Sequence, residues 1–297
     1  MQRTQRGRAG TSAVLLWVAA GAACGGGTAD AVGGGGASRC EPEPARPPGL
    51  LAAGSGTNLA LVRALAARWD DVAGGDRVEV PESIGTSGAV RALLDGAIDL
   101  GLASRPLTDD ERRRGLVETP LGDTLVALVL HPGPPVASID GRELLEIYSG
   151  RRTAWPDGTP IVPLLREAGD SGERILTAAF PELGPAFDEA RAKERWTICY
   201  TDQEMRDALL ALPGALGLLD VGTLRLERLP LVALALGEVA ATPGEALAGR
   251  YPLRKRLSAL TVGAPAGAVA QFLSFARSPA ASAVLEEGGY LPAELGD

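Results

Sequence analysis

Beyond the first fifty positions, the hydrophobic residues alternate between short apolar runs and segments with helical spacing. Leu50–Ala53 is one such run, and Leu61, Leu65 and Trp69 in the next segment share one face of a helix. A second run and a second helix follow, and residues 98–102 then alternate as a third strand. This order predicts an α/β fold in which most neighbouring strands are parallel.

A possible division into two lobes follows from one strong strand and the breakers after it. Residues 124–130 form a continuous apolar run, typical of a strand covered on both faces, and His131 opens a cluster of prolines and glycine. We expect one crossing between lobes near His131 and a second near Leu229. The predicted first lobe covers 50–130, the second lobe 131–228, and the return to the first lobe 229–297. Further helices are predicted at 141–148, from 171, at 203–212, 266–277 and 279–287, and further strands at 77–80, 161–165, 215–219, 229–236 and 253–262.

The first 49 residues have the composition of a targeting segment followed by a tether. Three arginines precede an eight-residue apolar run, far below the roughly 20 residues of a membrane span, which predicts a secretory signal at 1–24. The small residues before Cys24 resemble a bacterial lipoprotein signal, so Cys24 is a predicted lipidation site and ordinary secretion is the alternative. Residues 25–49 contain eight Gly and four Pro, which predicts a flexible tether.

Composition and charge exclude several classes of partner. Lys and Arg number 29 against 37 Asp and Glu, a net charge of −8, and loss of the three signal arginines gives 26 − 37 = −11. An acidic chain of this kind is not expected to bind nucleic acid. With one His and three Cys, none at ligand spacing, neither a metal nor a cofactor is expected. Cys40 and Cys199 can pair in an oxidising compartment, and a buried free Cys199 is the alternative.

Three turns combine glycine with hydroxyl side chains, and each is predicted to open a helix. They are Gly-Ser-Gly-Thr at 54–57, Gly-Thr-Ser-Gly at 85–88 and Asp-Ser-Gly at 170–172. Free N–H groups at a helix N-terminus, with nearby hydroxyls, bind anions without any lysine. Capping explains each turn taken singly. Because ligands of open α/β folds bind beyond the carboxyl ends of the strands, the three turns together predict a small-anion site.

Three segments, 54–57, 84–94 and 98–107, resemble the phosphate-binding proteins of bacterial phosphate ABC transporters, which are class II periplasmic binding proteins. The block 84–107 is the most specific part, and Leu144–Trp155 is similar to another stretch of the family. The resemblance implies a two-lobed periplasmic-binding-protein fold that captures inorganic phosphate and delivers it to an ABC permease. It also implies an exported, monomeric binding protein rather than an enzyme.

The same resemblance implies roles for individual residues. Thr57 and Asn58 fall where the family supplies donors to phosphate oxygens, and Thr86 falls on a family serine donor. Ser104 stands where the family has an aspartate that accepts the proton of the bound phosphate, so a preference for a protonated oxyanion is not implied here. Arg105 can face either the anion or the solvent. The predicted ligand-binding residues are Ser55, Gly56, Thr57, Asn58, Thr86, Ser87, Gly88, Ser104, Arg105, Arg166, Ser171 and Gly172.

The second lobe departs from the family at one position. Arg166 and residues 169–174 resemble the family's arginine and Ser-Gly-Thr loop, with Glu173 in place of the threonine. Because an inward carboxylate would repel phosphate, we expect Glu173 to point outward and only its amide to face the cleft. If Glu173 points inward, phosphate is the wrong ligand.

Two alternatives to phosphate capture stay open. The solute can be another one, such as sulfate, molybdate or an organic acid, and the protein can be a sensor without a transporter. Residues 169–172 also resemble the nucleophile motif of trypsin-like proteases, which would require Ser171 with His131 as its base. The α/β pattern and Glu173 argue against that enzyme.

Overall fold

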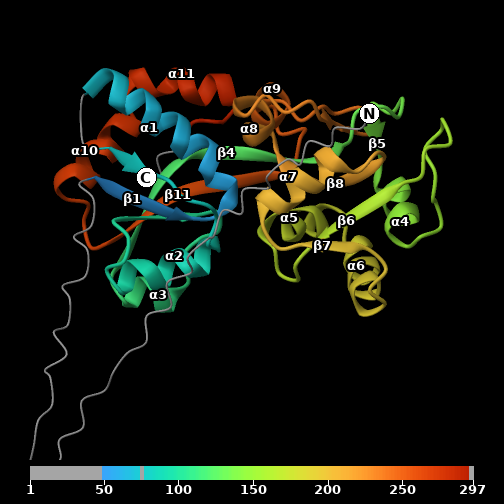
Figure 1. Cartoon of the computed structure of the whole chain (residues 1–297), viewed down its shortest axis with the longest axis horizontal. Helices are drawn as coiled ribbons and strands as arrows, with labels where there is room; N and C mark the ends of the chain where they lie inside the picture. The colour runs from blue at the N-terminus through green and yellow to red at the C-terminus, as the bar shows by residue number, and fades with distance from the viewer. Residues whose placement is uncertain (1–48, 74–76, 294–297) are drawn as a thin grey trace, which may run out of the picture. The chain divides into compact units, whose positions relative to one another are not determined.

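A nine-stranded sheet runs through the computed structural model, which describes residues 49–73 and 77–293 (Figure 1). Its strand order is β2-β1-β3-β11-β4-β8-β6-β7, and β9 pairs with β4 outside this path. A separate pair consists of β5 (Ser138–Ile139) and β10 (Ala235–Leu236). The strands of the large sheet are β1 (Leu50–Gly54), β2 (Val78–Glu79), β3 (Leu100–Ala103), β4 (Leu116–Leu130), β6 (Val162–Arg166), β7 (Thr197–Cys199), β8 (Ala215–Asp220), β9 (Val232–Ala233) and β11 (Arg254–Val262).

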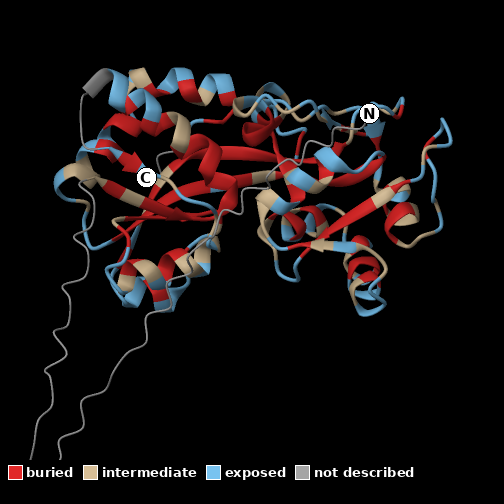
Figure 2. Ribbon diagram, in the orientation of Figure 1, coloured by how far each residue is buried: buried red, intermediate tan, exposed pale blue. Residues whose placement is uncertain are grey.

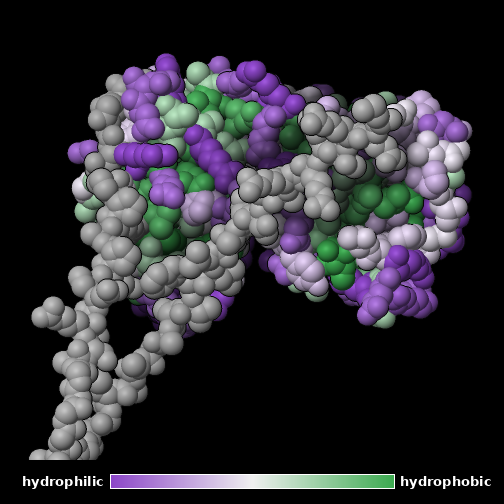
Figure 3. All heavy atoms as spheres, in the orientation of Figure 1, coloured by the Kyte–Doolittle hydropathy of each residue, from purple (hydrophilic) through white to green (hydrophobic). Residues whose placement is uncertain are grey.

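Helices cover the sheet, and Figure 1 shows α1, α10 and α11 on one side of β1 and β11, with α2 and α3 on the other. The predicted helices at 141–148, 203–212, 266–277 and 279–287 are confirmed to within one residue at each end. On the face shown in Figure 3, hydrophilic side chains gather over the outer helices α11 and α6. The helices are α1 (Leu59–Ala73), α2 (Gly85–Leu94), α3 (Asp109–Arg113), α4 (Gly141–Tyr148), α5 (Ser171–Ala179), α6 (Leu183–Ala192), α7 (Asp202–Ala211), α8 (Val221–Leu226), α9 (Pro243–Leu247), α10 (Gly267–Ala276) and α11 (Pro279–Gly288), with a 3-10 turn, η1, at Gly56–Asn58.

Parallel pairing occupies both ends of the sheet, whereas its middle is antiparallel. β1 runs parallel to β2 and β3, and β6 runs parallel to β7 and β8. Between these groups β11 is antiparallel to β3 and β4, and β4 is antiparallel to β8. The single strand predicted at 229–236 is wrong, because the chain changes partner there, from β4 in β9 to β5 in β10.

Two large apolar cores lie along this sheet (Figure 2). The first packs β1, β3 and β11 against α1, α10 and α11, and the second surrounds β6, β8 and the C-terminal half of β4. β4 passes from the first core at Leu121 to the second at Leu125, and β11 returns from Leu253 to Leu257. The two passing segments are paired, with Gly122 opposite Leu257.

These passing segments lie at other positions than His131 and Leu229, near which the crossings between lobes are predicted. His131 follows the far end of β4, where its amide donates to the Ala215 carbonyl, and Leu229 packs against the second core. Proline and glycine mark the end of a strand, but a strand that continues through two cores leaves no such break in the sequence. The predicted lobe boundaries at 130/131 and 228/229 stay predictions.

Several predictions about the N-terminal part fall outside the described residues. The signal segment at 1–24 with Cys24, almost all of the tether, and Cys40 all lie there. Cys199 is buried with a free thiol, and burial raises the pKa of that thiol. Its pairing with Cys40 stays a prediction. In the two described ranges, no helix has both the length and the apolar character that a membrane crossing requires.

Asp220, the last residue of β8, links the second core to the segment of β4 that passes between the two cores. Its carboxylate accepts hydrogen bonds from the Thr223 amide at 2.9 Å and the Thr223 hydroxyl at 2.7 Å, which caps α8. The Thr124 hydroxyl of β4 donates to the same carboxylate at 3.2 Å. Complete burial raises the pKa of Asp220 to about 6, although these hydrogen bonds favour the ionised form.

The buried carboxyl predicts a pH-dependent difference in stability. A folded-state pKa above the unfolded value means that the folded chain holds the proton more tightly, so stability falls as pH rises from about 4 to about 6. At 1.36 kcal/mol per unit, the contribution reaches about 3 kcal/mol. In urea titrations, the stability of the parent relative to an Asp220→Asn variant should drop by up to that amount between pH 4 and pH 7. A difference that does not change with pH would contradict this environment for Asp220.

Candidate functional site

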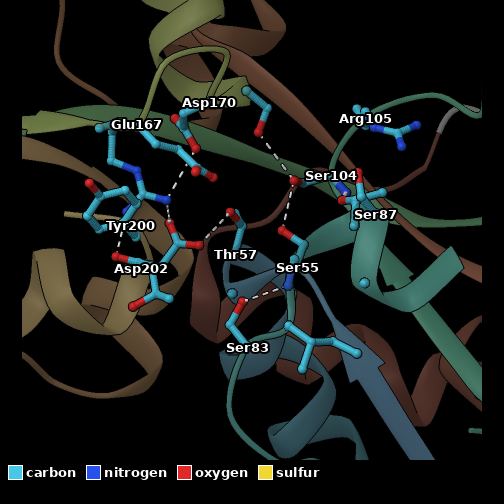
Figure 4. Close-up of a pocket in the computed structure, with 18 of the residues that line it drawn as sticks. Ser55, Thr57, Ser83, Ser87, Ser104, Arg105, Glu167, Asp170, Tyr200 and Asp202 are labelled. Atoms are coloured by element: carbon cyan, nitrogen blue, oxygen red, sulfur yellow. Dashed lines mark hydrogen bonds and ion pairs between the residues drawn. The ribbon is translucent and has the colours of Figure 1, made fainter. Parts of the chain in front are cut away.

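A cavity of about 440 Å³ opens between loops that follow strands of the two cores (Figure 4). From the first core it receives the turn after β1, the first turn of α2 and the residues after β3. From the second core it receives the loop between β6 and α5 and the residues that lead into α7. The lining residues are Ser55, Gly56, Thr57, Ser83, Ile84, Gly85, Thr86, Ser87, Gly88, Arg91, Ser104, Arg105, Arg166, Glu167, Gly169, Asp170, Ser171, Arg174, Tyr200, Thr201 and Asp202.

Three serine hydroxyls from distant segments meet in this cavity. Ser55 donates to the Ser104 oxygen at 2.8 Å, and the oxygens of Ser104 and Ser171 lie 3.3 Å apart. Ser55 follows β1, Ser104 follows β3 and Ser171 begins α5. The structure thus joins two of the predicted glycine-hydroxyl turns through Ser104. A hydroxyl both donates and accepts, so these side chains can turn their protons toward an anion.

Close backbone packing shapes the first of these turns. Gly54 lies against Leu102 of β3 and Gly56 against Asp202 of α7, and a Cβ atom at either glycine would collide with its neighbour. Asn58 is fully buried, and its side-chain amide donates to the Ala103 carbonyl at 3.0 Å. Asn58 does not line the cavity. It ties η1 to the end of β3, so this predicted ligand-binding residue has a structural position.

The N-terminus of α2 opens into the cavity, and of its first-turn amides that of Gly85 donates to the Ser83 hydroxyl at 3.3 Å. Ile84, the residue before the helix, offers no capping hydrogen bond, and Thr86, Ser87 and Gly88 line the cavity. The Thr86 hydroxyl accepts from the Ser104 amide at 3.3 Å, which joins α2 to β3. Amides at the positive end of a ten-residue helix favour a bound anion.

The N-terminus of α5 is occupied by its own carboxylate instead. Asp170 accepts from the Gly172 amide at 2.9 Å and from the Glu173 amide at 3.0 Å. Gly172 is not among the residues that line the main cavity, and its role as a ligand-binding residue stays a prediction. The turn signal was correct, but aspartate is itself a strong N-cap and competes with any external anion.

Arg166, which ends β6, carries the positive charge of the second core's side of the cavity. It is 5% exposed, and its guanidinium donates to Asp170 at 3.2 Å and lies 3.8 Å from Asp202. It also donates to the Thr201 carbonyl. Burial opposes its charge, but Asp202 and Asp170 outweigh burial and hold the pKa of Arg166 above its ordinary value.

Asp202 bridges the two sides of the cavity. One carboxylate oxygen faces Arg166, and the other accepts a long hydrogen bond, 3.5 Å, from the Thr57 hydroxyl. Figure 4 shows this carboxylate with a dashed line to Thr57. Asp202 thus contacts two donors, the Thr57 hydroxyl and the Arg166 guanidinium, that a bound anion would use, and both contacts are long.

Arg105 is not free to bind a ligand. Both ends of its guanidinium pair with Glu111 of α3, at 2.7 and 2.9 Å, and Figure 4 shows the side chain turned away from Ser104. This ion pair lowers the pKa of Glu111 to about 2. Arg105 lines the cavity while Glu111 holds its guanidinium, and whether it faces an anion or the solvent stays a prediction.

Glu173 neither faces the solvent nor enters the cavity. It is 7% exposed, and Arg191 of α6 holds its carboxylate in an ion pair. Burial raises the pKa of Glu173, and Arg191 opposes that rise. The carboxylate is directed away from the cavity, in line with the prediction that it does not point into the cleft, but Arg191 rather than solvent holds it, so it does not exclude a phosphate ligand.

Several lining residues carry no signal in the sequence. Thr201 and Asp202 follow β7, a strand of only three residues that apolar spacing does not reveal. Lys255, in β11, donates to the Thr57 hydroxyl from below the cavity at 3.0 Å. Arg174 could have been found, since it lies one helical turn after Ser171. Within the described ranges, no cluster of metal-ligating side chains occurs, and His131 is not among the residues that line the cavity.

A family model described as the PBP superfamily domain matches residues 20–280. The chain belongs to the PBP superfamily. Among curated proteins, the chain is similar to the phosphate-binding protein PstS 2 of Streptococcus agalactiae serotype V, at 29% identity over 80 residues. That match covers 27% of each chain, so the chain spans about a quarter of the curated relative.

Solved structures of other members share the fold. A Clostridium perfringens protein with bound phosphate, described as a phosphate ABC transporter substrate-binding protein, superposes with a TM-score of 0.69 at 19% identity, over 83% of this chain and 100% of that one. The periplasmic molybdate-binding protein of Azotobacter vinelandii gives a TM-score of 0.57 at 13% identity, over 82% and 100%. Since these two relatives hold different oxyanions, the fold alone does not choose the ligand.

The Glu173–Arg191 pair predicts a large but reversible loss of stability. Arg191→Met should lower the free energy of unfolding by about 3 kcal/mol at pH 7, because it leaves a buried carboxylate unpaired. Adding Glu173→Gln should restore most of the loss. Urea unfolding measures both variants, with Lys193→Met, which removes a surface ion pair to Glu189, as the neutral control. If Arg191→Met is as harmless as that control, the buried pair is not formed.

Proposed function

We propose that this protein captures inorganic phosphate, or a similar small oxyanion, in the cavity and delivers it to an ABC permease. One observation carries the proposal. The hydroxyls of Ser55, Ser104 and Ser171, the first turn of α2, and Arg166 all converge on one cavity. Oriented hydroxyls and amides with one guanidinium are donors suited to a tetrahedral anion, since a guanidinium can bind two oxygens at once.

Phosphate is the preferred ligand because two sequence likenesses support it. The block 84–107 resembles phosphate-binding proteins, and the curated relative with local sequence similarity is named as one. Sulfate, molybdate and organic acids are the competing solutes, and molybdate has support from a relative with the same fold.

Binding would proceed by exchange of partners within the cavity. The anion replaces Asp202 as the partner of the Thr57 hydroxyl, now 3.5 Å from Asp202, and of the Arg166 guanidinium, now 3.8 Å from it. Asp170 continues to accept hydrogen bonds from the amides of α5 and keeps Arg166 in place. The paired segments of β4 and β11 then act as the hinge, and closure about them buries the anion between the two cores.

The remaining parts of the proposal concern the setting of the protein. The signal at 1–24 would export the chain, and lipidation of Cys24 with the tether at 25–49 would hold it at the membrane. The protein would work as a monomer, without a cofactor and without catalysis. Ser171 faces Ser104 rather than a base, which favours binding over hydrolysis.

Calorimetric titration of ligand-stripped protein with phosphate, sulfate and molybdate tests the proposal. Phosphate should bind at micromolar concentration or below, more tightly than the other two. Arg166→Gln should weaken phosphate binding at least about 100-fold, or about 3 kcal/mol, because a buried charge-assisted donor is lost.

Arg105→Gln is the matched control, since it is the same substitution in another cavity-lining arginine that is held by a carboxylate. Its phosphate affinity should stay within about three-fold of the parent, because that guanidinium is committed to Glu111. The absence of phosphate binding, or an equal loss in both variants, would refute the proposed site.

A further inference from the structure

Lys255 places a second buried positive charge beneath the cavity. It is 5% exposed, and its ammonium group donates to the Thr57 hydroxyl at 3.0 Å. Lys255 stands opposite Thr124, within the paired segments where β4 and β11 pass between the cores. The chain has only one other lysine, Lys193, whose ammonium group lies at the surface and pairs with Glu189.

A small second cavity of about 10 Å³ connects Lys255 to the anion site. It shares four lining residues with the main cavity and adds Asp220 and Lys255 below them. The four shared residues are Thr57, Arg166, Asp170 and Asp202. A charge in this position acts on the main cavity at short range and through little solvent.

Lys255 brings the charges of this region closer to balance. Three carboxyl groups, Asp170, Asp202 and Asp220, face Arg166 and Lys255 here, so with all of them ionised the net charge is 2 − 3 = −1. Lys255 and Arg166 together lower the pKa of Asp170 against the effect of its burial. Without Lys255 the same count would be 1 − 3 = −2, and an added anion would meet stronger repulsion.

The direction of the Lys255 hydrogen bond determines what Thr57 can do. An ammonium group has no lone pair, so it can only donate, and the Thr57 oxygen must accept. The hydroxyl proton of Thr57 is then directed to a different acceptor, which in this structure is Asp202 at 3.5 Å. A bound oxyanion that replaced this distant carboxylate would receive that proton.

We propose that Lys255 is a positioning residue of the anion site, which commits the Thr57 hydroxyl to donate to the bound oxyanion and offsets the carboxylates around it. The inference rests on the proposed function. It gives β11 a role in ligand binding, because Lys255 lies in that strand and outside the three glycine-hydroxyl turns. A lysine that only satisfied the buried carboxylates would not act through Thr57.

A double-mutant cycle tests whether Lys255 acts through Thr57. Phosphate titration of the parent, Thr57→Val, Lys255→Met and the double variant should show at least ten-fold weaker binding for each single variant. The double variant should bind within about three-fold of Lys255→Met, because the two residues share one interaction. Losses that multiply, or an unchanged affinity in Lys255→Met, would overturn the inference while leaving phosphate binding by the parent intact.

A measurement on the parent protein covers the case in which Lys255→Met fails to fold. Labelling lysine with ¹⁵N at Nζ gives two side-chain signals, and Lys193 serves as the internal control. Saturating phosphate should shift the Lys255 signal and leave that of Lys193 unchanged. If calorimetry shows that phosphate binds and the Lys255 signal does not move, the inference is wrong. If phosphate does not bind at all, the proposed function fails first.

Discussion

The antiparallel pairing of β4 with β11 holds the two large cores together and sets where the cavity can form. Both strands pass from one core to the other in the segments where Gly122 stands opposite Leu257. Asp123 strengthens this junction through ion pairs to Arg254 and Arg256 and through main-chain hydrogen bonds to Leu291. The loops that carry the hydroxyls and Arg166 extend from strands on either side of this junction, so each side contributes part of the site.

Charge in this protein has to be considered at two scales. The whole chain has a net charge of −8, which disfavours the approach of any anion at low salt. At the cavity, Arg166 and Lys255 offset neighbouring carboxylates, and the N-terminus of α2 adds a fixed partial positive charge. An acidic protein can therefore hold an anion where donors are oriented and water is excluded. Asp202 contacts the Thr57 hydroxyl at 3.5 Å and the Arg166 guanidinium at 3.8 Å.

The sequence predicted the parts of the site that have a local pattern. Ser55, Thr86 and Ser171 lie at helix starts marked by glycine and hydroxyls, and Ser104 was found through the family resemblance; all four line the cavity. Asp202 and Lys255 were missed because one charged residue at a helix start or in a strand looks the same whether it faces solvent or a cavity.

Partners set by the fold decide what the sequence left open. The orientation of Arg105 and the partner of Glu173 depend on Glu111 and Arg191, which hold them in ion pairs. Thr108 and Glu111 have the residue types and spacing of a capping box, which the sequence shows. That Glu111 also accepts hydrogen bonds from Arg105 depends on the fold. The passage between the cores has no local signal either, since β4 continues through both cores without a break.

A crystal structure of the protein with saturating phosphate tests the central claim most directly. The account predicts a tetrahedral anion in the main cavity, with its oxygens about 2.6–3.2 Å from the Thr57 and Ser104 hydroxyls and from Arg166. Asp202 should have left Thr57, and Lys255 should still donate to the Thr57 oxygen. Phosphate bound elsewhere, or Asp202 still in contact with both Thr57 and Arg166, would contradict the account.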